Sequence, residues 1–134
     1  MNLLDADICI DLLRGYTPAM TWFAGAPKSD IAVPGFVAFE LVAGCRDGQS
    51  RKRLDVLLKL DVLLKPFPRV WASPAVLENT FQTYSMLMLS HGIGAFDLMT
   101  AAVALETNAT IYTFNQKHFG AVPGLKIHAP YARI

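Results

Sequence analysis

Short apolar runs alternate along the chain with longer segments in which apolar residues recur at helical spacing. Short runs bounded by Gly, Pro or polar residues are typical of strands. Five such runs stand at Leu3–Leu4, Ile31–Val33, Val70–Trp71, Ile111–Phe114 and Leu125–Ile127. The intervening segments predict helices at 5–15, 17–23, 36–43, 50–65, 73–92 and 97–108.

This alternation predicts an α/β domain, in which a central parallel sheet is covered by helices. With 134 residues, the chain is expected to form one domain, spanning 1–134. In such sheets the functional crevice lies beyond the carboxyl ends of the strands. That edge would carry Asp5, after the first strand, and Asn115, after the Ile111–Phe114 strand. Asp97 would reach the same edge if its helix begins there.

Composition narrows the classes of partner. Lys and Arg number 12 against 11 Asp and Glu, so the charge gives no sign of a broad nucleic-acid or membrane surface. The apolar share of 53% is high for a globular domain and predicts an apolar protein interface beyond the core. The longest stretch without charged residues, 79–96, contains Asn, Thr, Gln, Ser and His, so we expect no membrane span.

Cysteine use and the start of the chain bear on the compartment. Cys9 and Cys45 are far apart and lack CxxC spacing, so neither a disulfide framework nor a zinc site is indicated. The opening MNLLDAD has neither the basic region nor the cleavage site of a signal peptide. We therefore expect a reducing, cytoplasmic location.

The opening run LLDADICIDLL carries aspartates at three positions among apolar residues. A buried carboxylate without a partner is costly, so each must reach water, cap a helix or meet a cation. Asp5 or Asp7 would serve as an N-cap, and Asp11, in the second turn, is expected to be solvated. Glu40 is less ordinary, because in GFVAFELVAG it shares a helical row with apolar side chains. Asp97 fits a first-turn acid favoured by the helix dipole.

Taken together, these acids permit a sharper hypothesis. If Asp5, Glu40 and Asp97 converge, each pair about 4 Å apart repels by about 4 kcal/mol at an effective dielectric constant of roughly 20. Such a group requires protonation or a cation. Hard oxygen ligands suit Mg²⁺ or Mn²⁺, which also bridge to phosphate oxygens. The chemistry that follows is metal-assisted attack of water on a phosphodiester.

The chain resembles a known family in four stretches, namely LLDADICIDLL, FELVAG, FDLMTAAVALETNATIYTFNQKHF and PGLKIHAPY. Their order and spacing are similar to those of PIN-domain ribonucleases of the VapC toxin type, nearly end to end. The resemblance implies a PIN-like three-layer sandwich and an Mg²⁺- or Mn²⁺-dependent endoribonuclease that is the toxin of a toxin–antitoxin pair. By resemblance, Asp5, Glu40 and Asp97 are the metal ligands and Asn115 is the fourth position of the site. Thr113 falls on the Thr that helps to order this site.

Several positions depart from the pattern of that family. Asp7, a supporting residue, stands where similar proteins usually have Asn, and it adds negative charge. His118 stands where many relatives have a further Asp. Pro34 and Val37 stand where Ser and Thr are common upstream of Glu40, so its polar support is expected to be weaker.

The resemblance also implies partners: an RNA substrate, a second copy of the chain in a homodimer, and a cognate antitoxin. The C-terminal segment of the antitoxin would cover the acidic groove and bring an Arg among the carboxylates. Docking surfaces are expected around Trp22, Phe23 and the tandem repeat of LDVLLK at 54–65.

Basic side chains give weaker indications of RNA binding. The candidates for steering RNA phosphates are Arg14, Arg51, Lys52 and Arg53. A solvated helix start explains the run at 51–53 more simply. His91 and His118 would suit a general base, but we expect helix-end and surface roles for them, because a metal already activates water.

Two other functions stay open as alternatives. DADIC resembles the DxDxT loop of haloacid-dehalogenase phosphatases, in which Asp5 would be a nucleophile and Asp7 its acid/base. Against this, Cys9 replaces the Thr and no lysine motif precedes Asp97. A receiver-type signalling domain would need an acceptor Asp on the third strand and a Lys on the fifth, and neither has an obvious counterpart.

Overall fold

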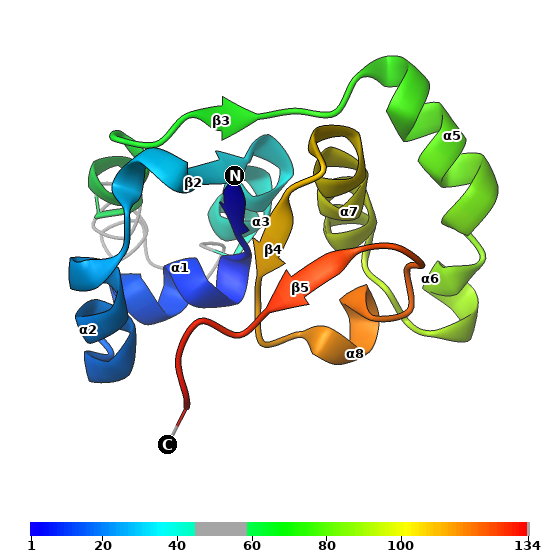
Figure 1. The fold of residues 1–134 in the computed structure, drawn as a ribbon. Helices are drawn as coiled ribbons and strands as arrows, with labels where there is room; N and C mark the ends of the chain where they lie inside the picture. Colours follow the sequence, from blue (N-terminus) through cyan, green and yellow to red (C-terminus); the bar gives the residue numbers. More distant parts are fainter. Residues whose placement is uncertain (45–58, 134) are drawn as a thin grey trace.

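A five-stranded parallel sheet forms the centre of the computed structural model, which describes residues 1–44 and 59–133. The strands lie in the order β3-β2-β1-β4-β5 (Figure 1), and each pair is parallel. Their bounds are β1 (Asn2–Leu4), β2 (Ile31–Pro34), β3 (Arg69–Val70), β4 (Thr110–Tyr112) and β5 (Lys126–His128). The predicted α/β fold with a parallel sheet is therefore confirmed.

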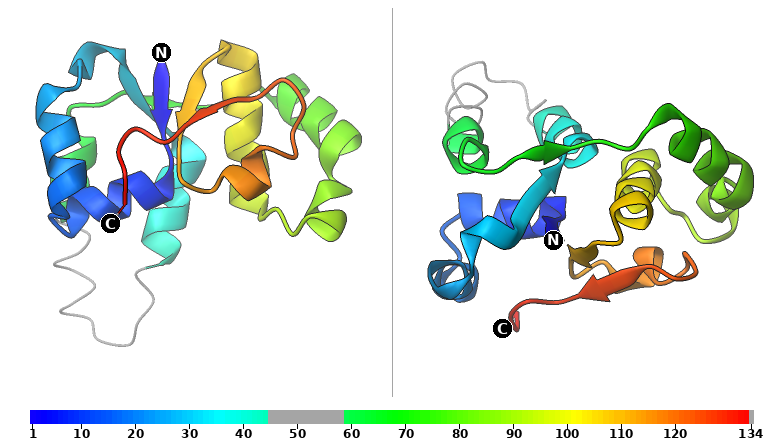
Figure 2. Two further views of the ribbon diagram at one scale, coloured as in Figure 1. Left: turned by 60° about the horizontal axis from the view of Figure 1, so that its bottom comes forward. Right: turned by 45° about the horizontal axis from the view of Figure 1, so that its top comes forward.

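Helices cover both faces of the sheet and complete three layers (Figures 1 and 2). One face is covered by α1 (Ala6–Leu13), α2 (Thr17–Gly25), α3 (Gly35–Ala43) and helical residues 59–64. The other face is covered by α5 (Pro74–Tyr84), α6 (Leu87–Ser90), α7 (Ala95–Thr107) and α8 (Gln116–Phe119). A 3-10 turn, Lys28–Asp30, leads into β2. Among the described residues, no helix is both long enough and apolar enough to span a membrane.

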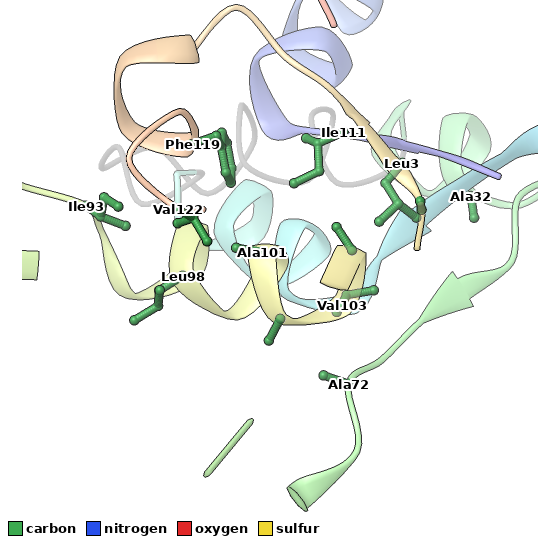
Figure 3. Close-up of a cluster of buried hydrophobic side chains, with 13 residues drawn as sticks. Leu3, Ala32, Ala72, Ile93, Leu98, Ala101, Val103, Ile111, Phe119 and Val122 are labelled. Carbon is green, nitrogen blue, oxygen red and sulfur yellow. The ribbon is translucent and has the colours of Figure 1, made fainter. Parts of the chain in front are cut away.

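Two apolar cores lie on the two faces of the sheet, and β1 contributes to both. Leu3 and Leu4 are both 0% exposed, but they belong to different clusters. In Figure 3, Leu3 and Ile111 lie on the side of the sheet covered by α7, which carries Ala101 and Val103 of the first cluster. Leu4 packs with residues of α1, α2 and α3 in the second. Because successive side chains of a strand point to opposite faces, a short central strand joins both cores.

The start of α3 is fixed by a close approach to Trp71, the residue after β3. A Cβ atom at Gly35 would lie 2.3 Å from the indole ring, so a larger side chain would push the ring away. Phe36 and Phe39 contact the same indole edge-on, with ring centroids 5.4 and 6.0 Å away. These contacts set the direction in which α3 leaves the sheet, and α3 carries Glu40.

Several predicted helix ends are confirmed by the backbone. Gly15, with a φ of 68°, follows α1, and Asn108, with a φ of 55°, ends α7. The left-handed conformation suits both residues, because Gly has no Cβ and Asn tolerates this region. Ser73 caps α5, and its hydroxyl accepts a hydrogen bond from the Val76 N–H at 3.3 Å.

Other boundaries differ from the prediction. The segment 73–92 forms two helices rather than one, because the chain turns after Tyr84 and Leu87 can then pack against the α7 cluster. The fourth strand ends at Tyr112, two residues early, because the next residues bond to aspartates of the site. The predicted helix 50–65 begins outside the described residues.

Candidate active site

Three carboxylates carried by α1, α3 and α7 meet at the carboxyl edge of the sheet. Asp5 follows β1 and occupies the N-cap position of α1, Glu40 lies in α3, and Asp97 lies in the first turn of α7. Each offers one carboxylate oxygen, and these oxygens lie within 4.8 Å of one another. The predicted convergence is therefore observed, while the role of the three acids as ligands stays a prediction.

Thr113, which is 0% exposed, connects two parts of this site. Its hydroxyl donates to Asp5 Oδ2 at 2.7 Å and accepts from the backbone N–H of Asn115 at 2.9 Å. The Asn115 side chain in turn donates to Asp97 Oδ2 at 3.3 Å. One buried hydroxyl thus fixes the carboxylate of the first strand and the start of the loop that carries the amide.

Asp7 is occupied by protein groups at both of its oxygens. Oδ1 accepts the N–H of Ile8 and Oδ2 accepts the N–H of Phe114, each at 2.8 Å. Thr113 approaches Oδ2 less closely, at 3.4 Å. Asp7 is also outside the group of oxygens within 4.8 Å. These contacts are those of a brace between α1 and the loop after β4.

Two oxygens of the converging acids have no hydrogen-bond partner. In the described part of the chain, Asp5 Oδ1 and Glu40 Oε1 are buried and accept no hydrogen bond. Asp5 is only 4% exposed, and its side chain makes no N-cap bond although it occupies the N-cap position. A buried acceptor without a donor is costly, so these two oxygens are suited to bind a cation or a hydrogen-bond donor.

The electrostatics of the site agree with its geometry. Burial, reinforced by the charge of Asp7, raises the pKa of Asp5 to about 7 in spite of the Thr113 bond. Burial and the charge of Asp97 raise the pKa of Glu40 to about 7. Burial also raises the pKa of Asp7 and of Asp97. The site therefore resists carrying its full negative charge near neutral pH.

This donor set fits a divalent metal ion. Asp5, Glu40 and Asp97 supply hard carboxylate oxygens, and two of these residues have a buried oxygen without a partner. Mg²⁺ and Mn²⁺ prefer such ligands and would offset the mutual repulsion of the acids. Carboxylates held this close without a cation would be forced to take up protons.

His118 lies in the last turn of α8 with its side chain 32% exposed, as expected, but it also reaches the acidic group, which was not expected. Its Nδ1 lies 3.1 Å from the Asn115 amide nitrogen and 3.8 Å from Asp97 Oδ2. The imidazole opposes the effect of burial on the pKa of Asp97. His91 stands at the end of α6 and is exposed, as expected. Nothing in the local sequence KHF predicts the contact of His118 with Asp97. The one indication is that His118 stands at a position where many members of the family have an Asp.

The prediction that Asp11 is solvated is wrong. Its side chain is only 11% exposed and pairs with Arg133, whose Nη2 is 3.0 Å from Asp11 Oδ2. The hydroxyl of Tyr131 donates to the same oxygen at 2.7 Å. Both partners lie 120 or more residues away along the chain, so no local pattern could reveal them.

Other predicted residues lie away from this group or outside the described chain. Arg14 is exposed at the C-terminal end of α1, whereas Asp5 is at its N-terminal end. The run at 51–53 falls outside the described residues. Trp22 packs against Tyr112 with ring centroids 5.7 Å apart, so it belongs to the core more than to a free docking surface. Phe23 likewise packs against Phe67, at 5.7 Å.

Comparison with known proteins gives the same result over nearly the whole chain. The family model for the PIN domain matches residues 3–125. A curated relative, Ribonuclease VapC19 of Mycobacterium tuberculosis, is 28% identical over 129 residues, which are 94% of this chain and 98% of the relative.

Solved structures share the fold. VapBC2 from Rickettsia felis, bound to a DNA fragment from its promoter, has a TM-score of 0.78 and 24% identity, covering 95% of this chain and 96% of that one. FitAcB from Neisseria gonorrhoeae has a TM-score of 0.73 and 23% identity, covering 97% and 98%. DNA-bound VapBC from Salmonella typhimurium has a TM-score of 0.79 and 18% identity, covering 95% and 96%. With the family match over residues 3–125, these findings establish that the chain belongs to the PIN domain family.

Proposed function

We propose that this chain is an Mg²⁺- or Mn²⁺-dependent endoribonuclease and the toxin of a toxin–antitoxin pair, acting as one domain over residues 1–134. The observation that carries the proposal is the group of three carboxylates within 4.8 Å, two of which have a buried oxygen without a partner. The similarity to a relative named as a ribonuclease supports RNA as the substrate. We further infer that it acts in the cytoplasm, where RNA is available.

Asp5, Glu40 and Asp97 would hold the metal ion. When bound, such an ion supplies positive charge that lowers the pKa of a water molecule and stabilises the charge that develops on the phosphate. The remaining residues would position these groups. Thr113 holds Asp5 through its 2.7 Å bond, so the carboxylate keeps one oxygen bonded and the other available.

Asn115 would orient water or phosphate in the reaction. Its amide nitrogen donates to Asp97 and lies next to His118, which fixes the amide plane. The amide oxygen can then accept a hydrogen bond from the attacking water. Asp7 would keep the loop of Asn115 against α1 through the Phe114 N–H. In this role Asp7 supports the site without binding metal.

Two protein partners follow from the same proposal. One structural neighbour, from Klebsiella pneumoniae, is described as a toxin–antitoxin complex, which supports a cognate antitoxin for this chain. A homodimer is proposed as well, and the exposed apolar side chains of Phe39, Phe81, Met86 and Leu89 would suit an interface between proteins. Light scattering at micromolar concentration is expected to give a dimer, and a strict monomer would contradict it.

The nuclease proposal is tested by incubating the protein with total RNA in Mn²⁺, in Mg²⁺ and in EDTA, and by mapping the cut ends. Cleavage is expected with either metal and is expected to disappear in EDTA and in Asp97→Asn. Asn is a matched control because it keeps the size of the side chain and removes its charge. Cleavage that persists in EDTA or in this variant would refute the proposal.

The phosphatase alternative is not favoured. The PIN family match covers the same acids that the alternative would use. Cys9, in the position of the phosphatase Thr, is 0% exposed and therefore faces no substrate. Hydrolysis of p-nitrophenyl phosphate, measured beside the RNA assay, is expected to be absent. If the wild type hydrolyses that ester and Asp5→Asn does not, the phosphatase assignment would be favoured over the ribonuclease assignment.

A further inference from the structure

The last described residues of the chain are anchored on α1 by Asp11. Tyr131 donates its hydroxyl to Asp11 Oδ2 at 2.7 Å, and burial together with this bond raises the pKa of the hydroxyl, so it stays a donor. Arg133 donates to the same oxygen from Nε at 3.1 Å and pairs with it through Nη2 at 3.0 Å. Figure 2 shows the C-terminus passing beside α1. The buried acid therefore fixes a cation at a defined place.

That place borders the loop that carries Asn115. The guanidinium of Arg133 lies 4.2 Å from the centre of the Phe114 ring. Phe114 immediately precedes Asn115, and its N–H donates to Asp7 at 2.8 Å. The positive charge of Arg133 also opposes the effect of burial on the pKa of Asp7. The cation is thus within electrostatic reach of Asp7, which braces this loop.

One edge of the guanidinium is held by Asp11, and the other edge makes no hydrogen bond within residues 1–44 and 59–133. Of its five N–H groups, the one on Nε and one on Nη2 point to Asp11. The Arg133 side chain is 43% exposed while that of Asp11 is 11% exposed, so the anchor is buried and the cation is accessible. A planar fork fixed on an aromatic ring is pre-organised for a phosphate, because little side-chain entropy is lost on binding.

Negative charge at the site makes a cation such as Arg133 useful for binding an anionic substrate. In addition to burial, the charges of Asp7 and Asp97 raise the pKa of Asp5 and of Glu40, so these four acids lie close together and repel a polyanion. A single metal ion cannot offset all of this charge and also that of flanking phosphates. A fixed cation beside the loop of Asn115 would attract a phosphate of the RNA backbone that flanks the acidic group.

We propose that Arg133 binds a backbone phosphate of single-stranded RNA beside the scissile bond, and that Asp11, Tyr131 and Phe114 hold it in position for this contact. The inference rests on the proposed nuclease function and adds a substrate-binding residue to it. It also gives a role to Asp11, which takes no part in the acidic group.

The test measures binding of a fluorescein-labelled, mixed-sequence, single-stranded RNA 20-mer by anisotropy, with Ca²⁺ in place of Mg²⁺ to slow cleavage. Arg133→Gln is expected to raise the Kd about tenfold. It is also expected to reduce the slope of log Kd against log salt by about 0.7, the value for one phosphate contact on a single strand. Arg133→Lys is expected to keep the salt slope and to weaken binding about threefold, because the ammonium cannot bind bidentately.

Lys126→Gln is the matched control for loss of one positive charge. Lys126 is exposed at the N-terminal end of β5, opposite Thr110 and so at the far edge of the sheet from the site. Its Kd and salt slope are expected to equal those of the wild type. An equal effect of Lys126→Gln and Arg133→Gln would show only general charge attraction and would overturn the proposal.

A merely structural clamp gives a different result. In that case Arg133→Gln would lower the melting temperature but leave the Kd and the salt slope unchanged, which would overturn the proposal. If Arg133→Gln does not fold, Arg133→Lys decides, and an unchanged Kd in that variant counts against the contact. If the wild type cleaves RNA and the variants bind RNA as tightly as the wild type, this inference alone is refuted. If the wild type does not cleave RNA, the proposed function is refuted as well.

Discussion

Two aspartates of the same segment, Asp5 and Asp11, are both buried, with 4% and 8% of their surface exposed. Asp5 occupies the N-cap position of α1 and Asp11 lies in its last turn, and their surroundings carry opposite charge. Asp11 accepts hydrogen bonds from Tyr131 and Arg133. Asp5 accepts one from Thr113, faces two further acids, and keeps one oxygen without a partner.

The difference shows what the chain itself provides and what it leaves to a ligand. At Asp11 the fold places the guanidinium of Arg133 beside the buried carboxylate, so this charge is neutralised without a bound ligand. At Asp5 the fold brings more negative charge, and burial raises the pKa to about 7. A buried charge that the protein neutralises is part of the scaffold, whereas one that it leaves unneutralised indicates a binding site.

The largest expected difference between the two regions is in RNA cleavage. Glu40→Gln removes a predicted ligand and is expected to lower the cleavage rate by at least about 100-fold, the upper end of the loss known for outer partners of metal ligands. Asp11→Asn is expected to lower it by less than about tenfold, because it loosens only the anchor of Arg133. Initial rates on one labelled RNA compare the two variants. Equal losses would remove the distinction between site and scaffold.

Stability without metal is expected to change in opposite directions. Asp5→Asn removes a buried charge that repels its neighbours, so the free energy of unfolding in EDTA at pH 8 should rise by roughly 1–3 kcal/mol. Asp11→Asn leaves Arg133 without its counter-charge, and the free energy of unfolding should fall by roughly 1–3 kcal/mol. Urea denaturation of both variants measures the two signs. Destabilisation by Asp5→Asn would contradict the idea of stored repulsion.

The pH dependence should follow the same acids. Asp5 and Glu40 have pKa values of about 7 in the folded protein, above the ordinary 3.8 and 4.5. Between about pH 4 and about pH 7 the folded state therefore binds more protons than the unfolded state. The stability that the protonated carboxyls of Asp5 and Glu40 contribute is lost as the pH rises through this range. The measurement is the melting temperature of the wild type minus that of Asp5→Asn, both in EDTA. This difference should fall by roughly 5 °C between pH 5 and pH 8.

Mn²⁺ provides the control for this pH effect. Metal binding requires deprotonated ligands, so added Mn²⁺ should raise the melting temperature at pH 8 more than at pH 5. A larger rise at pH 5 would show that the ion binds somewhere other than the acidic group.

The smallest expected effect concerns the scaffold. Tyr131→Phe removes one hydroxyl donor from Asp11 while Arg133 remains, so the free energy of unfolding should fall by about 1 kcal/mol. The bond joins residues 120 positions apart, and it ties the C-terminal segment to α1. Thermal unfolding of the wild type and of Tyr131→Phe at low salt measures this loss of stability. No change in stability would mean that the arginine alone satisfies the buried acid.

The fold and the acidic group were largely predictable because their signals are local. Each strand is a short apolar run, and Gly15 and Asn108 mark helix ends through backbone conformations that few residues adopt. Asp5, Glu40 and Asp97 are acids in apolar surroundings, and strand order directs them to one edge.

The environment of Asp11 and His118 was not predictable, because it depends on tertiary contacts. Asp11 looks like an exposed acid on a helix until Tyr131 and Arg133 return to it from the end of the chain. His118 acquires its contact with Asp97 only because α8 places it beside the first turn of α7. Sequence patterns specify which side chains are unusual, and the fold decides which of them meet.

Calorimetric titration of Mn²⁺ into the wild type, Asp5→Asn and Asp11→Asn at pH 8 tests the central claim most directly. The wild type and Asp11→Asn should bind the ion with similar affinity, because Asp11 is outside the group of oxygens within 4.8 Å. Asp5→Asn should bind it at least about tenfold more weakly. Equal affinity of Asp5→Asn and the wild type would contradict the claim that the unpartnered acids form a metal site.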